Sequence, residues 1–420
     1  MAAEMTVECK LARDYAMINV EDTLGYLLIK AVPNSSVQLG SMPLNIGVVI
    51  DVSRSMKGRK LEVAIEATKL LVSSLQEQDW LSVITFSDDA QIVIPAVQAS
   101  DKATLLAAVG KIRVINGTRM FHGMEASIRE MRKSGLPNKI NRMILLTDGE
   151  TEGEERCRII ATQERSSDIV ISAVGIGKRY NENLLSEVAD TTLGRFSHLK
   201  SPEQITEIFQ KELSMAAASV ISDVTMDVLP GEGVRVESLD RVFPNSVRLQ
   251  PIIEDNGRVF KVDLGNLTKD DPTIIGARLK LPSAPAGRVK ITRILLHYDI
   301  PGLGITGGTE SQDVFIEYTV NQELCGQVDR EVVSYFNQIN AQNLIEEAIR
   351  QTRVGNIDEA TQSLSQAQAI TEKLGNLPLT QDIREALDEL EAKGILSPEN
   401  VKTIKAGSRQ TVQVKKSDVK

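Results

Sequence analysis

Five oxygen-bearing side chains in three short clusters have the composition of a metal site. The clusters are Asp51-Val52-Ser53-Arg54-Ser55, Asn116-Gly117-Thr118 and Thr147-Asp148-Gly149, and the candidate ligands are Asp51, Ser53, Ser55, Thr118 and Asp148. Two carboxylates and three neutral hydroxyls suit a hard divalent cation such as Mg²⁺, which prefers oxygen ligands and usually keeps open positions. The neutral hydroxyls would leave the cation electron-poor, so that it could accept a carboxylate from another molecule.

Buried strands would bring these clusters together. Residues 44–51 (LNIGVVID) and 141–147 (NRMILLT) are nearly continuous apolar runs, which is typical of parallel strands covered on both faces. Each run leads into one of the two acids. A helical stripe of apolar residues follows the first run, and strands and helices then alternate to about residue 217, which predicts a doubly wound α/β domain. Ligands of such sheets bind at the carboxyl ends of the strands, where Asp51 and Asp148 would meet.

The rest of the chain predicts a second architecture. Short strands separated by turn signals over residues 219–320 indicate an antiparallel β-sandwich, and strands at about 4–13 and 23–32 would complete it, so the α/β domain is predicted to be inserted in the sandwich. Helical periodicity then begins near residue 328. The predicted domains are 1–42 (N-terminal strands of the sandwich), 43–217 (α/β domain), 218–325 (sandwich), 326–400 (helical region) and 401–420 (basic tail).

Charge and cysteine content narrow the class of protein. The 48 basic and 57 acidic residues give a net charge of −9, which argues against nucleic acid as a partner. Residues 402–420 hold six basic residues and one acid, a local charge of +5, and we expect this basic tail to be disordered. The three cysteines lie far apart, and no apolar run reaches the ~18 residues that a membrane span needs. We therefore expect free thiols and a cytoplasmic protein.

In this order and spacing, the D-x-S-x-S cluster, the Gly-Thr loop and the Thr-Asp-Gly strand end resemble the metal-ion-dependent adhesion site of von Willebrand factor type A (VWA) domains. The resemblance covers residues 43–217 and implies a Rossmann-like fold with Asp51, Ser53, Ser55, Thr118 and Asp148 as metal ligands. The whole layout resembles bacterial cytosolic VWA proteins. For the metal-ion-dependent adhesion site we expect Mg²⁺, with Mn²⁺ or Ca²⁺ as alternatives, and a protein partner that presents an Asp or Glu. Asn116 and His122 depart from the family pattern without removing a ligand.

Structural interpretations compete with the metal site. Ser53, Ser55 or Thr118 could each cap a helix. The acidic run from Glu150 to Glu155 could be a solvated first helical turn or, as an alternative, a second cation site. The three histidines have no metal-ligand spacing, and the default interpretation places them on the surface or in the core: His122, His198 and His297.

Three functions are compatible with these residues. We favour a non-catalytic, cation-dependent protein-interaction module. The alternative is a metal-dependent hydrolase or phosphoryl-transfer enzyme, although the sequence has no G-x-x-x-x-G-K-[ST], H-E-x-x-H or G-x-S-x-G motif. A third hypothesis is a scaffold with a structural metal, whose partner would bind whether or not the metal is present.

Overall fold

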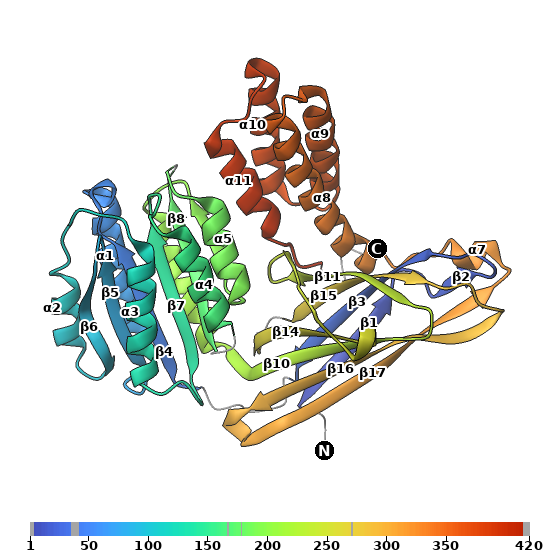
Figure 1. Ribbon diagram of the computed structural model, residues 1–420, viewed down its shortest axis with the longest axis horizontal. Helices are drawn as coiled ribbons and strands as arrows, with labels where there is room; N and C mark the ends of the chain where they lie inside the picture. Colours follow the sequence, from blue (N-terminus) through green and yellow to red (C-terminus); the bar gives the residue numbers. More distant parts are fainter. Residues whose placement is uncertain (1–3, 35–41, 166–167, 178, 270–271, 415–420) are drawn as a thin grey trace. The chain divides into compact units, whose positions relative to one another are not determined.

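The computed structural model describes residues 4–34, 42–165, 168–177, 179–269 and 272–414, and the chain separates into two units (Figure 1). The α/β unit is continuous in sequence, Gly40–Ser219, whereas the second unit combines Met1–Leu39 with Val220–Lys420. Each unit has its own hydrophobic core. The fold confirms the predicted α/β domain inserted between strands of a β-sandwich.

A largely parallel sheet forms the centre of the α/β unit. Its described strands lie in the order β6 (Ala90–Gln98), β5 (Trp80–Phe86), β4 (Leu44–Asp51), β7 (Ile140–Thr147), β8 (Ile169–Ile176) and β9 (Phe196–Leu199). All neighbours run parallel except β6, which is antiparallel to β5. Every residue of β4, β7 and β8 is buried, as expected for strands covered on both faces.

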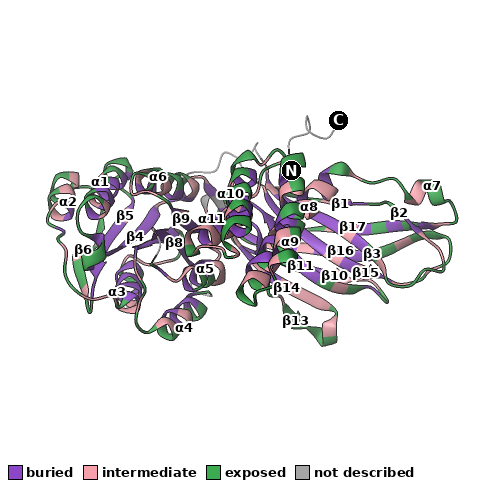
Figure 2. Ribbon diagram, turned by 90° about the horizontal axis from the view of Figure 1, so that it is seen from above, coloured by how far each residue is buried: buried purple, intermediate pink, exposed green. Residues whose placement is uncertain are grey.

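Helices cover both faces of this sheet, which makes the domain doubly wound (Figure 2). One layer contains α1 (Arg59–Ser74), α2 (Lys102–Val109) and α6 (Gln204–Ala217). The other contains α3 (Met120–Lys133), α4 (Glu154–Glu164) and α5 (Glu182–Thr191). The side chains of α3 lie so close to β4 that a Cβ atom at Gly47 would come within 2.5 Å of Ser127 Oγ. The candidate ligands Asp51 and Asp148 lie at the carboxyl ends of two of these buried strands, β4 and β7.

Two sheets form the sandwich of the second unit. In the described residues, one sheet has the order β1 (Met5–Leu11), β3 (Thr23–Pro33), β15 (Thr273–Leu281), β11 (Arg235–Phe243) and β12 (Val247–Arg248). The other has the order β13 (Ile252–Glu254), β14 (Val259–Thr268), β10 (Ser219–Pro230), β16 (Gly287–Ile300), β17 (Ile305–Thr319) and β2 (Tyr15–Met17). The N-terminal strands join both sheets, since β3 pairs with β15 and β2 pairs with β17. The β2–β17 pair is parallel, which departs from the predicted antiparallel sandwich.

Helices continue the second unit after β17: α7 (Gln322–Cys325), α8 (Arg330–Arg353), α9 (Ile357–Lys373), α10 (Leu377–Lys393) and α11 (Pro398–Arg409). Pro378 lies in the first turn of α10, where its missing N–H costs no hydrogen bond. Within the described residues, no helix is both long and apolar enough to cross a membrane.

The prediction of a disordered tail over 401–420 is wrong for its first part. Residues 398–409 form α11, and Lys402 and Ile404 are buried. The chain then runs back along α8, where the Gln338 side chain bonds the backbone of Val412 in both directions. The long aliphatic part of a lysine side chain can be buried while its charge finds polar partners, so basic composition did not prevent packing. Residues 415–420 lie outside the described residues.

An ion-paired carboxylate fixes α8 on the outer face of the β1–β3 sheet. Glu331, in the first turn of α8, accepts hydrogen bonds from Lys10 of β1, at 2.6 Å, and from Lys30 of β3. Apolar contacts of Val332, Tyr335 and Ile339 with the sheet surround this contact. Burial on its own raises the pKa of Glu331, but the hydrogen bonds from the two lysines outweigh it and lower the pKa overall.

We expect Glu331→Gln to destabilise the second unit. Because the folded-state pKa of Glu331 is lowered, its contribution is complete above the unfolded-state pKa of about 4.3 and is lost as pH falls through the folded-state pKa. In denaturant unfolding, the free energies of unfolding of the variant and the wild type should therefore differ at pH 7 and converge in acid. Glu391→Gln, at an exposed position of α10, is the matched control. A stability difference that stays constant down to pH 2 would contradict this role.

Candidate metal centre

Asp51 ends β4 and is fully buried. One carboxylate oxygen accepts the backbone N–H of Ser53 at 2.8 Å, and the other accepts the Thr147 hydroxyl at 2.7 Å. Thr147 is the last residue of β7, so this bond ties the first loop to the neighbouring strand. Burial raises the pKa of Asp51, and the hydrogen bonds from Thr147 and Ser53 only partly counteract it.

The hydroxyl of Ser53 contacts that of Ser55, the hydroxyl of Ser55 contacts Asp148, and neither side chain caps a helix. Ser53 Oγ lies 3.0 Å from Ser55 Oγ, and Ser55 Oγ donates to Asp148 Oδ1 at 2.6 Å. Ser53 precedes the short 3-10 helix η1 (Arg54–Met56) without a side-chain capping bond, and Gly58 holds the N-cap position of α1. The capping interpretation of these serines is therefore wrong.

Asp148 follows β7 at the same edge of the sheet, and its side chain is completely buried. Its second oxygen, Oδ2, accepts a hydrogen bond from the Nζ of Lys60 in α1. Both oxygens of Asp148 thus have donors, one a serine hydroxyl and the other an ammonium group. Asp51, Ser53, Ser55 and Asp148 consequently form one connected cluster.

Thr118 lies in the loop before α3. Gly117 has φ of +110°, and a Cβ atom there would lie 2.3 Å from the backbone N of Asp88, so the loop requires glycine at this position. The Thr118 carbonyl accepts the Thr151 hydroxyl at 2.7 Å and the N–H of Glu152 at 3.1 Å, which links the loop to the segment after β7. Among the described residues, its side chain makes no hydrogen bond to the other four candidates. It does not cap α3, whose N-cap is Arg119.

The donor set fits a hard divalent cation. The candidate ligand atoms of the cluster are all oxygens. The two serine hydroxyls are 3.0 Å apart, close to the ~3 Å between adjacent oxygens around Mg²⁺ with bonds of roughly 2.1 Å. Among the described residues, Asp51 has only neutral hydrogen-bond partners and no ion pair. The described residues contain no group of three or more His, Cys, Asp or Glu side chains placed to hold a metal, so any cation here would depend on the hydroxyls.

The other polar residues of this region have structural partners. In the acidic run, Glu152 pairs with Arg119, and Glu154 and Glu155 pair with Arg158. These pairs favour the solvated-turn interpretation over a second cation site. The histidines are engaged elsewhere: His122 stacks on Phe121, His198 bonds the Tyr180 hydroxyl, and His297 bonds Asp227 in the second unit.

Two further residues bond the candidate ligands: Thr147, which the sequence placed in the third cluster without a role, and Lys60, which was not among the candidates. Thr147 was visible as the last residue of a buried strand, where its hydroxyl can reach a neighbouring loop. Lys60 carried a signal too, because a lysine in the first turn of a helix opposes the helix dipole and needs a reason to be there.

The family model of the von Willebrand factor type A domain matches residues 45–211. This segment is a VWA domain. A second family model, the Sll0103-like C-terminal alpha-helical domain, matches residues 330–414. It therefore includes α11 and the segment after it, in agreement with the ordered structure there.

Two bacterial proteins are similar to parts of this chain at 27–28% identity. The uncharacterised protein sll0103 of Synechocystis is 28% identical over 272 residues, which cover 63% of this chain and 64% of that protein. The uncharacterised protein YfbK of Escherichia coli is 27% identical over 190 residues, which cover 44% of this chain and 33% of that one. The chain thus spans less than two thirds of either relative. A solved structure, the von Willebrand factor type A protein from Catenulispora acidiphila, has a TM-score of 0.83 at 19% identity, covers 98% of both chains and shows the same fold.

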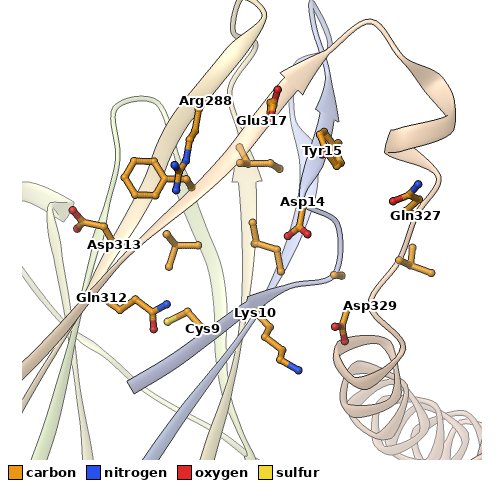
Figure 3. Close-up of a pocket in the computed structure, with 16 residues that line it drawn as sticks. Cys9, Lys10, Asp14, Tyr15, Arg288, Gln312, Asp313, Glu317, Gln327 and Asp329 are labelled. Carbon is orange, nitrogen blue, oxygen red and sulfur yellow. The ribbon is translucent and has the colours of Figure 1, made fainter. Parts of the chain in front are cut away.

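The second unit has a cleft of about 610 Å³ between β1, β17 and the segment before α8 (Figure 3). Cys9 is among the residues that line it, and burial raises the pKa of its thiol to about 12. The thiol therefore stays protonated at neutral pH and is a poor nucleophile. The described lining contains no histidine that could activate it.

Proposed function

We propose that this protein is a non-catalytic, divalent-cation-dependent protein-interaction module. Asp51, Ser53, Ser55, Thr118 and Asp148 of the VWA domain would hold the cation, with Mg²⁺ as the expected ion and Mn²⁺ or Ca²⁺ as alternatives. When bound, the cation supplies a positive centre that attracts a carboxylate oxygen of a partner's Asp or Glu. The three free cysteines support the cytoplasm as the place where it acts.

One observation carries this proposal: the fully buried Asp51 carboxylate has no ion pair in the described structure, although a second carboxylate lies at the same edge. A buried charge without a partner is costly, and a bound cation would compensate it. The exposed Ser55 places the cluster where a partner can reach it. Among the described residues, the hydrogen-bond partners of Asp51 are a backbone amide and a hydroxyl, and such groups do not serve as a general base at neutral pH.

We expect partner capture to depend on both the metal and the serines. Tagged protein should retain a specific partner from native lysate with Mg²⁺ and lose it with EDTA, and the double variant Ser53→Ala/Ser55→Ala should lose it in both conditions. The matched control is Ser73→Ala/Ser74→Ala, which alters two exposed serines at the far end of α1. Capture that survives EDTA would favour the scaffold with a structural metal. Turnover of ATP or a phosphoester that disappears in Asp148→Ala would favour the enzyme.

A further inference from the structure

Lys60 places a positive charge inside the candidate metal centre. It is the second residue of α1, and its Nζ donates to Asp148 Oδ2 and, at 3.3 Å, to the carbonyl oxygen of Ser55. The side chain of Lys60 is 32% exposed, whereas that of Asp148 is 0% exposed. The ammonium group of Lys60 therefore contacts Asp148 and Ser55, which are both candidate ligands.

The position of Lys60 has a local cost. A cation in the first turn of a helix is repelled by the positive end of the helix dipole. Its contacts with Asp148 and Ser55 offset this repulsion. The two acids also differ, since Asp148 is paired with an ammonium group while Asp51 contacts neutral donors only. The chain thus supplies its own cation to one of the two carboxylates.

We propose that Lys60 is a tethered cation that competes with the divalent metal for Asp148 and so lowers the metal affinity of the site. This inference rests on the proposed function, because it concerns the same ligands. Two positive charges that share one buried carboxylate repel each other, and the repulsion is strong where water is excluded. Metal binding therefore requires the ammonium group to leave Asp148 Oδ2, and the 32% exposure of the Lys60 side chain gives it access to solvent. In the metal-free state the same contact stabilises the domain.

The first test measures metal affinity by calorimetric titration of the full chain with Mg²⁺ and with Mn²⁺. Lys60→Gln should bind both ions at least about tenfold more tightly than the wild type, by a similar factor for each, because the competing charge acts on any divalent cation. Lys60→Arg keeps the charge and should stay close to the wild type. Lys57→Gln is the matched control, since it removes a positive charge from an exposed position in the turn that precedes α1.

The second test measures stability without metal. In EDTA, Lys60→Gln should unfold at lower denaturant concentration than the wild type, because Asp148 loses its ion pair. At saturating Mg²⁺ this difference should shrink or change sign. Lys57→Gln should follow the wild type in both conditions.

The outcomes separate this inference from the proposed function. Wild-type binding of Mg²⁺ with no tightening in Lys60→Gln would overturn the competition and leave the metal site intact. Weaker binding in Lys60→Gln would show instead that Lys60 positions Asp148 as a ligand, which also overturns it. If neither protein binds a divalent cation, the inference and the proposed function both fail. Binding by Lys60→Gln alone would support the inference in its strongest form.

Discussion

Replacement of Asp51 by alanine is expected to reduce the Mg²⁺ affinity of the VWA domain by more than about 100-fold, because it removes a charged ligand and not merely a group that orients one. Asp51 is the candidate ligand with the most buried and least compensated charge. Without the Asp51 carboxylate, the Thr147 hydroxyl still has an acceptor, because the carbonyl oxygen of Gly149 lies 3.4 Å away. Calorimetric titration with Mg²⁺ and circular dichroism would measure binding and fold in the same sample.

The matched control for this experiment is Asp89→Ala. Asp89 is an exposed aspartate in the loop between β5 and β6, and its replacement changes the net charge by the same amount. It should bind Mg²⁺ like the wild type. If Asp51→Ala keeps the wild-type affinity, the ligand assignment is wrong. If both variants lose the same affinity, the loss follows from the change in net charge and not from the removal of a ligand.

Replacement of Glu212 by glutamine is expected to destabilise the VWA domain by about 3 kcal/mol, because it leaves a buried cation without its partner. Glu212 of α6 accepts a hydrogen bond from Arg142 of β7 at 2.9 Å and another from the Ser172 hydroxyl of β8. All three side chains are buried. This contact fixes the last helix of the domain on two strands of the sheet. In thermal unfolding the expected loss corresponds to roughly 6–12 °C for a domain of this size.

Two further variants separate the ion pair from other effects. Glu207→Gln alters an exposed glutamate on the same helix and should change stability by less than about 0.5 kcal/mol. The double variant Arg142→Met/Glu212→Leu replaces both charges by apolar side chains and should recover much of the loss, as is usual when both members of a buried pair are replaced. Equal midpoints of thermal unfolding for Glu212→Gln and Glu207→Gln would show that the Arg142–Glu212 ion pair does not stabilise the domain.

Much of the fold followed from local patterns. The run from Leu44 to Asp51 predicts its own strand because a continuous apolar segment is stable only when both faces are covered. The helical tail was missed although its start carries a signal: Ser397 caps α11 through the N–H of Asn400, and Pro398 occupies the first turn. Composition does not report which face of a segment is buried, whereas capping residues mark where a helix begins.

The candidate site divides in the same way between sequence and tertiary structure. The sequence alone determined which oxygen-bearing side chains follow which strand, since the carboxyl ends of adjacent parallel strands must share an edge. Only the tertiary structure decided that Thr147 holds Asp51, that Ser55 bonds Asp148 and that Lys60 supplies a cation to the same carboxylate. These contacts join residues about 90 positions apart. Contacts between residues so far apart in sequence depend on how strands and helices pack, whereas the spacing of residues along the chain indicates only the local conformation.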